Sequence, residues 1–155
     1  MSAVLKDPLL EFRPMTEADL DTVMSIEVTA YSHPWTRGIF QDCLRVGYCC
    51  WTLEEDGLVI GYGVMSVAAG ECHILNLCIC PESQNTGYGA LLLEKLLEIA
   101  RKHRADTAFL EVRPSNEPAI QLYEHAGFDK VGMRRDYYPA EFGREDALIF
   151  ARSLL

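Results

Sequence analysis

The chain has 155 residues, of which 49% are hydrophobic and 24% charged, and its formal net charge is −9. This length and composition are ordinary for one soluble globular domain over residues 1–155. The negative charge argues against nucleic acid as a direct partner, because binding phosphates takes Lys and Arg. No apolar run reaches the ~20 residues that span a bilayer, and Met1–Pro8 lacks the features of a signal peptide. We therefore expect a cytoplasmic monomer with no membrane partner.

Hydrophobic periodicity and turn residues divide the chain into elements in the order β-α-α-β-β-β-α-β-α-β-β. Strands are predicted over residues 9–13, 48–53, 58–67, 71–80, 108–113, 128–134 and 147–152. Helices are predicted from Thr16 to a break at Ser32–Thr36, and over residues 37–45, 86–103 and 116–126. This order predicts a mixed α/β (α+β) fold, in which a mixed central sheet of six to seven strands carries helices on both faces.

A glycine-containing turn joins the fourth predicted strand to the strongest predicted helix. It reads Gln84-Asn85-Thr86-Gly87-Tyr88-Gly89. Its two glycines let the backbone come close to a ligand, and the unpaired N–H groups of a first helical turn favour an anion. Neither a Walker loop nor the complete dinucleotide fingerprint is present. The turn therefore predicts a pyrophosphate-binding loop, and a plain strand-to-helix turn is the alternative.

One carboxylate stands inside the otherwise apolar strand predicted over residues 108–113. Strand alternation places Phe109, Glu111 and Arg113 on one face. A buried carboxylate is costly unless it is paired or used, and burial raises the pKa of such groups toward the range of a general base. Glu111 is therefore a candidate general base, and the alternative is a structural ion pair with Arg113 or another cation.

The helix predicted over residues 116–126 carries two further candidates. Asn116 stands at an N-cap position, and Tyr123 belongs to an apolar helical face. In the functional interpretation, Tyr123 donates a proton to a leaving group. In the structural interpretation, Tyr123 is a packed core aromatic and Asn116 is only a cap.

Two tyrosines precede a loop rich in Pro, Gly and acidic residues near the C-terminus. Tyr137 and Tyr138 follow Arg134-Arg135-Asp136, and Gly143 stands in the loop. Such tyrosines would wall a peptide groove, because their rings combine apolar area with a polar tip. An exposed hairpin loop is the alternative.

The six cysteines do not have the spacing of a metal site. No Cys-x-x-Cys pair occurs and no His stands at zinc-finger spacing, so we expect no metal. Small hydrophobic residues in a reducing cell are the favoured interpretation, and a redox role is the alternative. The cysteines are Cys43, Cys49, Cys50, Cys72, Cys78 and Cys80.

Together these segments resemble the GNAT N-acetyltransferase superfamily over essentially the whole chain. The Gln84–Gly89 turn matches the superfamily's Gln/Arg-x-x-Gly-x-Gly/Ala motif for coenzyme A, and the helix carrying Asn116 and Tyr123 follows at the expected distance. The resemblance implies acetyl-CoA as cosubstrate, Glu111 as general base and Tyr123 as general acid. It also implies cofactor contacts from Leu77, Cys78, Ile79, Asn85, Thr86, Gly87, Tyr88, Gly89, Ala90 and Asn116. Many relatives carry Arg where this chain has Asn85, so phosphate contacts here must lean on backbone N–H groups.

Several segments are similar to one branch of the superfamily, the bacterial enzymes that acetylate a ribosomal protein. They are His33–Trp35, Leu110–Asn116, Ala119–Tyr123, Arg134–Pro139 and Arg144–Ala147. This likeness implies that the acceptor is the N-terminal alanine of small-subunit ribosomal protein eighteen. It implies substrate contacts from Trp35, Tyr137 and Tyr138.

The acceptor is expected to be the N-terminal segment of a basic protein, which acidic side chains would attract. Candidate acidic residues are Glu27, Asp42, Glu141, Glu145 and Asp146. Two alternatives keep the fold. One is an enzyme that acetylates a lysine side chain or a small-molecule amine, and the other is a non-catalytic acyl-CoA-binding module.

Overall fold

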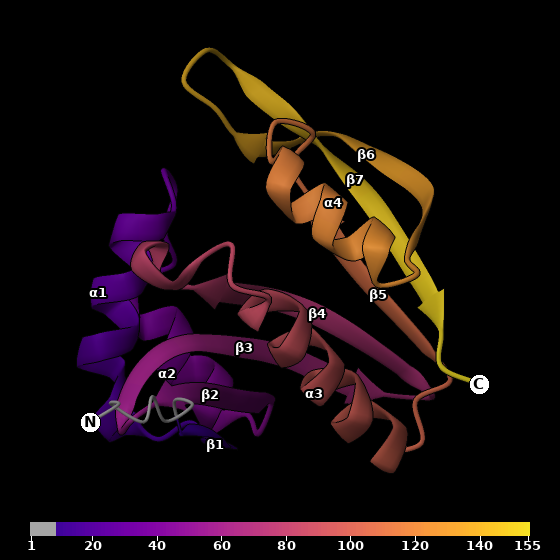
Figure 1. Ribbon diagram of the computed structural model, residues 1–155. Coiled ribbons are helices and arrows are strands. Elements are labelled where there is room, and N and C mark those ends of the chain that lie inside the picture. The colour runs from indigo at the N-terminus through magenta and orange to yellow at the C-terminus, as the bar shows by residue number, and fades with distance from the viewer. Residues whose placement is uncertain (1–8) are drawn as a thin grey trace, which may run out of the picture.

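The computed structural model describes residues 9–155, so the expectation about a signal peptide, which concerned residues 1–8, lies outside the described part. One seven-stranded sheet has the order β1-β2-β3-β4-β5-β7-β6 (Figure 1). The strands are β1 (Leu10–Pro14), β2 (Cys49–Glu55), β3 (Leu58–Ala68), β4 (Glu71–Ile79), β5 (Thr107–Val112), β6 (Asp129–Pro139) and β7 (Arg144–Ser153). The helices are α1 (Leu20–Ala30), α2 (Arg37–Arg45), α3 (Tyr88–Lys102) and α4 (Glu117–His125), with 3-10 turns η1 (Glu17–Asp19) and η2 (Pro81–Ser83). The predicted mixed α/β fold and its order of helices and strands are confirmed.

Helices cover both faces of the sheet (Figure 1). On one face, α1 packs against β3 and β4, and α2 packs against β2, around the fully buried Phe40 and Tyr62. On the other face, α3 covers β3 and β4, and α4 lies beside it over β5. The apolar positions of α3 recur at helical spacing, so its leucines fill this second core. They are Leu93, Leu96 and Leu97, and the neighbouring Leu92 packs in a smaller cluster with Leu53, Ile60 and Ile79.

The central strand β4 has a neighbour on both sides over only part of its length. It pairs with β3 from Glu71 to Ile79, but its parallel pairing with β5 extends only from Glu71 to Ile74. Beyond this point the two strands diverge, as Figure 1 shows. Within residues 9–155, the second edge of β4 therefore has no ladder partner after Ile74. Backbone groups at such an edge are available to a ligand.

A β-bulge at Leu75 redirects the side chains of β4. Ile74 pairs with Met65 and Asn76 pairs with Val64, so Leu75 has no residue opposite it on β3. One extra residue breaks the alternation of side chains between the two faces. Ile74 therefore packs in the α3 core, whereas Asn76 faces α1 and contacts Glu27 there.

The last two strands are longer than predicted. β6 reaches Pro139 and β7 begins at Arg144, so the predicted loop shrinks to residues 140–143. Tyr137 and Tyr138 thus belong to a hairpin that projects beyond the rest of the sheet in Figure 1. The side chains of this edge strand are mostly exposed, so its sequence carries little of the apolar alternation that marks a half-buried strand.

The six cysteines are free and are buried or half-buried. Burial raises the pKa of Cys72 and Cys78 to about 11, so their reactive thiolate forms are scarce at neutral pH. This favours the interpretation of these residues as small hydrophobic side chains. No cluster of three His, Cys, Asp or Glu within residues 9–155 is arranged to hold a metal. None of the described helices is long and apolar enough to cross a membrane.

Candidate active site

The turn before α3 has the backbone conformation of an anion-binding loop. Asn85 and Gly87 adopt left-handed φ angles of 62° and 84°, and Gly87 is the N-cap of α3. Left-handed residues in a turn gather backbone N–H groups into a concave nest, and the first helical turn adds its own unpaired N–H groups. An ideal Cβ at Gly89 would lie 3.5 Å from the Leu122 side chain, so α4 closely approaches this backbone. The turn is therefore suited to bind phosphate through backbone donors.

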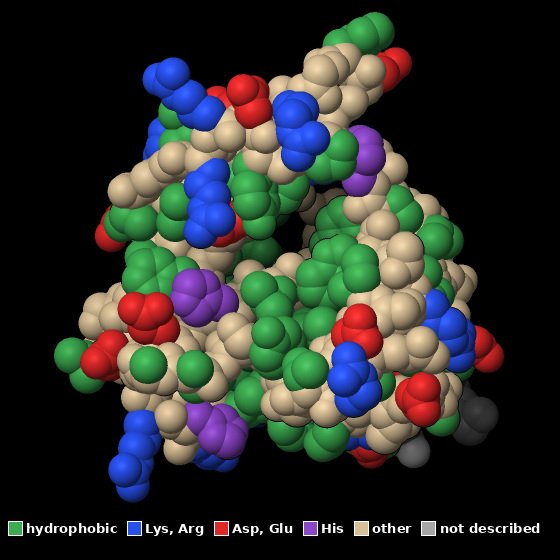
Figure 2. Space-filling model, turned by 180° about the vertical axis from the view of Figure 1, so that it is seen from behind, with side chains coloured by type: hydrophobic (Ala, Val, Ile, Leu, Met, Phe, Trp, Pro, Cys, Tyr) green, Lys and Arg blue, Asp and Glu red, His purple; other side chains and the backbone are tan. Residues whose placement is uncertain are grey.

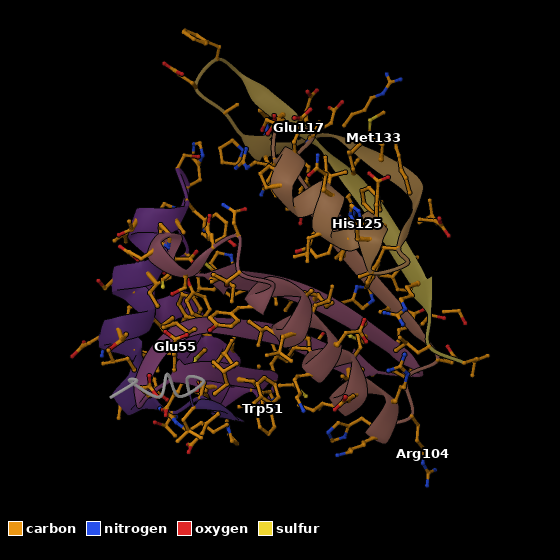
Figure 3. All side chains as sticks on the ribbon, in the orientation of Figure 1. Trp51, Glu55, Arg104, Glu117, His125 and Met133 are labelled. Carbon is orange, nitrogen blue, oxygen red and sulfur yellow. The ribbon has the colours of Figure 1, made fainter. Side chains whose placement is uncertain are left out.

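A groove of about 550 Å³ extends along this turn and the free edge of β4 to the end of α1. The first half of α4, which starts at Glu117 in Figure 3, forms the opposite wall. Eight of the ten residues predicted to contact the cofactor line this groove: Leu77, Cys78, Ile79, Asn85, Gly87, Gly89, Ala90 and Asn116. The Asn116 side chain also caps α4, because its Oδ1 accepts the Ala119 N–H at 3.3 Å.

Two predicted cofactor residues do not line the groove. The Thr86 hydroxyl donates to the Ser83 carbonyl at 2.6 Å, and the Tyr88 hydroxyl donates to the Glu55 carboxylate at 2.5 Å. Figure 3 shows Glu55 on the sheet, away from α4. The side chains of Thr86 and Tyr88 are thus occupied elsewhere, and only their backbone groups remain for a phosphate.

Hydrogen bonds of β4 show which of its backbone N–H and carbonyl groups face the groove. The Cys80 N–H donates to Ile60 of β3 at 2.7 Å, so strand alternation directs the backbone groups of Leu77 and Ile79 away from β3. The Leu77 carbonyl accepts the Tyr31 hydroxyl at 2.9 Å, and the Ile79 carbonyl accepts the Gln84 side-chain amide at 2.9 Å. The N–H groups of Leu77 and Ile79 therefore point toward the groove with their carbonyls already bonded.

A second pocket of about 350 Å³ lies on the face of the sheet away from α3, and Ile74 and Leu75 of β4 line it. Figure 2 shows that face, which is hollowed near its centre and bordered mainly by hydrophobic side chains. All three predicted substrate residues, Trp35, Tyr137 and Tyr138, line the pocket together with Glu111. The rings of Tyr137 and Tyr138 meet edge to face at 4.9 Å between centroids. These side chains come from a loop, a strand and a hairpin that are distant in sequence.

Glu111 lines the second pocket but is less buried than expected, with its side chain 27% exposed. Its Oε1 lies 3.3 Å from Nε of Arg134 on β6. Arg113, the partner considered from sequence, instead bonds the Pro139 carbonyl at 2.7 Å and lies 3.4 Å from Glu145. Glu111 thus faces solvent and one cation in an accessible pocket, as a proton acceptor for a substrate must.

Tyr123 is buried in α4 and lines neither pocket. Its ring packs against Phe128 with 5.9 Å between centroids. Burial raises the pKa of the Tyr123 phenol above its ordinary value, and the neighbouring Cys78 and Tyr138 add to this shift. Cys78 lines the groove and Tyr138 lines the second pocket.

The model of the acetyltransferase (GNAT) family matches residues 20–128. The chain belongs to this family. It is 37% identical over 133 residues to the [ribosomal protein bS18]-alanine N-acetyltransferase of Escherichia coli K12. The matched region covers 86% of this chain and 90% of that relative. The crystal structure of the ribosomal-protein-S18-alanine N-acetyltransferase from Escherichia coli matches with a TM-score of 0.87 at 34% identity, over 94% of each chain. Arabidopsis thaliana NAA60 in complex with acetyl-CoA has the same fold, with a TM-score of 0.83 at 18% identity over 94% of this chain and 98% of that chain.

Several residues around the site of this GNAT acetyltransferase were not singled out from sequence. Tyr31 and His33 line the groove, and His73 lines the second pocket with its ring stacked on Phe109 at 5.3 Å between centroids. His33 and Arg134 were expected only as parts of similar segments. The signal for Tyr31 and His33 was their place just before Trp35. No local pattern indicated that His73 would face a pocket.

One expectation about acidic residues of this acetyltransferase is wrong. Glu27 was expected to attract a basic peptide, but its side chain is only 1% exposed and is bonded inside the protein. Two others are also engaged, since Glu145 accepts the Ser115 hydroxyl at 2.9 Å and Asp146 accepts the Asp136 N–H at 2.9 Å. A cluster of free carboxylates is therefore a poor explanation for acceptor choice.

Proposed function

We propose that the protein transfers the acetyl group of acetyl-CoA to the N-terminal α-amine of a protein, with the N-terminal alanine of ribosomal protein bS18 as acceptor. One observation carries the proposal. Successive parts of β4 line a pocket that holds a carboxylate, through Ile74 and Leu75, and the groove beside the turn before α3, through Leu77–Ile79, where β4 and β5 separate. The Escherichia coli relative, whose name states this acceptor, supports the choice of substrate because the likeness covers 86% of the chain.

The groove suits acetyl-CoA in its chemistry. The Asn85–Gly89 turn would hold the pyrophosphate through backbone N–H groups. The N–H groups of Leu77 and Ile79 would bond the pantetheine arm, and one of them would stabilise the carbonyl oxygen as negative charge develops. Acetyl-CoA supplies the activated thioester that makes acyl transfer to an amine favourable.

Glu111 is the general base of this proposal. Only a neutral amine carries the lone pair that forms the new C–N bond, so the acceptor must lose a proton. An α-amine has a pKa near ~8 and a lysine near ~10.4, so roughly one α-amine in ten is neutral at pH 7. A lysine acceptor costs about 3 kcal/mol more to deprotonate, from the same values. A partly exposed carboxylate, acting directly or through one water, suits the easier task.

Tyr123 is assigned as the general acid from the resemblance to the GNAT superfamily, and its phenol would have to reach the sulfur from a buried position that lines neither pocket. When the C–S bond breaks, the departing sulfur needs a proton, and a phenol with a raised pKa still carries its proton at neutral pH. Between the ammonium ion and the amide, the nitrogen loses two protons: Glu111 accepts the first before attack and passes it to solvent, then accepts the second after the C–N bond forms. The phenolic proton goes to sulfur, and solvent exchange returns Glu111 and Tyr123 to their starting forms, with a net release of one proton. The products are an acetylated N-terminus and a free coenzyme A thiol.

The acceptor pocket favours a small N-terminal residue held between aromatic walls. Trp35, Tyr137 and Tyr138 supply those walls. Their polar tips can bond the peptide backbone while their rings contact the first side chain. This recognition would not depend on a basic second residue, since the predicted acidic residues are largely engaged elsewhere.

Release of free thiol from acetyl-CoA on addition of a peptide beginning Ala-Arg tests the proposal. We expect turnover, with mass spectrometry locating the acetyl group on the α-amine. The matched control is the same peptide with a blocked N-terminus and one free lysine. Acetylation of the control peptide would favour a lysine acceptor, and acetyl-CoA binding by calorimetry without thiol release for any peptide would favour the non-catalytic module.

A further inference from the structure

The carboxylate of Glu27, on α1, is buried and has no part in the proposed chemistry. Its residue is 1% exposed. Oε1 accepts the Tyr62 hydroxyl at 2.7 Å and the Asn76 side-chain amide at 3.0 Å, and Oε2 accepts the Trp35 backbone N–H at 2.8 Å. All three partners are neutral donors. A buried charge without a cation is costly and is tolerated only when its oxygens are well bonded, so this position constrains its donors closely.

Two of the three donors of Glu27, Trp35 and Asn76, belong to segments that line the two sites. Trp35 lines the acceptor pocket, and Tyr31 lines the cofactor groove. The Tyr31 hydroxyl donates to the Leu77 carbonyl at 2.9 Å and lies 3.3 Å from Oδ1 of Asn76. Glu27 therefore holds residues 31–35 against β4 at two points, directly through Trp35 and indirectly through Asn76 and Tyr31.

The bulge at Leu75 makes this network possible. Without the extra residue in β4, Asn76 would share the face of Ile74 and point into the α3 core. The bulge turns Asn76 to the α1 side, where Glu27 accepts its amide. Bulges are found beside active sites because they redirect single side chains in this way.

We propose that Glu27 is a positioning residue for acetyl transfer. It fixes residues 31–35 against β4, and so fixes the position of the acceptor pocket relative to the thioester end of the groove. The inference rests on the proposed function. Direct attack requires reacting atoms ~3–3.5 Å apart, and a wall displaced by ~1 Å can lower the rate about 10²-fold. Trp35, at one end of residues 31–35, fixes the wall that positions the acceptor amine. Tyr31, at the other end, fixes the part of β4 that holds the thioester.

Glu27→Gln tests the proposal with a side chain of equal size. Its amide has one acceptor oxygen in place of two, so a buried donor loses its partner. We expect kcat/KM for the Ala-Arg peptide to fall roughly 10–10²-fold, with little change in the Kd of acetyl-CoA, whose phosphates bind at the remote turn before α3. Unchanged kcat/KM would overturn the proposal.

The matched control is Asp19→Asn. Asp19 is also a buried carboxylate, 8% exposed and bonded to Arg13 at 2.7 Å, and it lines neither site. We expect this variant to lose thermal stability while keeping the kcat/KM of the wild type. An equal loss of kcat/KM in both variants would show that Glu27 acts only through general stability.

A second measurement separates this inference from the proposed function. Amide hydrogen exchange of residues 31–36 needs no turnover, and we expect it to rise about 10-fold or more in Glu27→Gln, whose Trp35 N–H loses its acceptor, while α3 stays protected. Unchanged exchange would overturn the positioning role. If exchange increases in Glu27→Gln but the wild-type protein acetylates no peptide, the anchoring role of Glu27 would be supported and the proposed function rejected.

A double-mutant cycle with Trp35→Ala completes the test. If Glu27 acts by placing Trp35, then adding Glu27→Gln to Trp35→Ala should lower kcat/KM much less than it does in the wild type. Full additivity of the two losses would contradict that coupling.

Discussion

The two halves of the site are built in different ways. The cofactor groove is shaped largely by backbone: a turn with left-handed residues, the N-terminus of α3 and one edge of β4. The acceptor pocket is built from side chains of Trp35, Glu111, Tyr137 and Tyr138, which come from three separate regions of the chain. Backbone donors recognise a phosphate whatever side chains surround them. In a pocket formed by side chains, by contrast, each substitution changes the shape and the polar groups that contact the substrate.

This difference predicts where substitutions should act. Changes of side chain in the acceptor pocket should alter kcat/KM for the peptide and leave acetyl-CoA binding intact. Changes of backbone conformation in the turn before α3 should weaken acetyl-CoA and leave the peptide alone. A variant that affects both sites equally would indicate that the halves are not separable.

Glu111→Gln should have the largest effect. The amide keeps the shape of the pocket but cannot take a proton, so we expect kcat/KM for the Ala-Arg peptide to fall roughly 10³-fold. Calorimetry should find the Kd of acetyl-CoA unchanged. The control is Glu98→Gln on the outer surface of α3, where the carboxylate is 56% exposed and the same charge is lost. A Glu111→Gln enzyme with the wild-type rate from pH 6 to 9 would remove this residue as the base.

Tyr123→Phe should lower kcat by roughly 10²-fold without affecting acetyl-CoA binding, because only proton donation is lost. Tyr48→Phe, at an exposed tyrosine that is 42% accessible, is the control. Stopped-flow thiol release would measure the chemical step directly. Weaker acetyl-CoA binding with normal turnover would assign Tyr123 to the groove wall instead.

The pH dependence provides an independent check on Tyr123. Burial raises the pKa of its phenol, so the acid form persists to higher pH than in a free tyrosine, which loses its proton near pH ~10. Acid catalysis by this group should therefore not decline with pH below that value. A decline of turnover below pH 9 that disappears in Tyr123→Phe would show that the direction of this shift is wrong.

Sequence patterns predicted the features that depend on residues close together in the chain. They missed the features that depend on pairing with residues distant in sequence. The turn at Gln84–Gly89 and the Asn116 cap were identified because each depends on a few neighbouring residues and on backbone chemistry. The bulge at Leu75 was missed, since a bulge depends on the register with β3. The partner of Glu111 was left open for the same reason, because Arg134 is brought there by the pairing of β6 with β7.

Gly87→Ala tests the backbone half of the comparison. An alanine at φ 84° is strained by about 1 kcal/mol. If the turn relieves this strain by moving away from the ligand, the Kd of acetyl-CoA should rise about fivefold. Gly57→Ala is closely matched, with φ 85° in the β2–β3 turn and open space around its Cβ. Both variants should lose similar thermal stability, and only the first should bind acetyl-CoA less tightly. Equal binding in the two would argue against a phosphate at this turn.

Arg134→Gln should have the smallest effect and the opposite sign. The acceptor approaches Glu111 mainly as an ammonium ion and must compete with the guanidinium of Arg134, which lies 3.3 Å from the carboxylate. An exposed pair of this kind is worth ~0.2–1 kcal/mol, so its removal should lower the peptide KM by up to about fivefold. The gain should shrink at high salt, which screens exposed charges.

Arg135→Gln is the control, because it removes the same charge from the adjacent residue of β6, whose side chain alternates to the other side of the strand. A lower KM in both variants would point to the net charge of the hairpin. A higher KM in Arg134→Gln alone would show that Arg134 helps to hold Glu111 in place for the amine, so that this ion pair belongs to the positioning of the base and not to competition with the substrate.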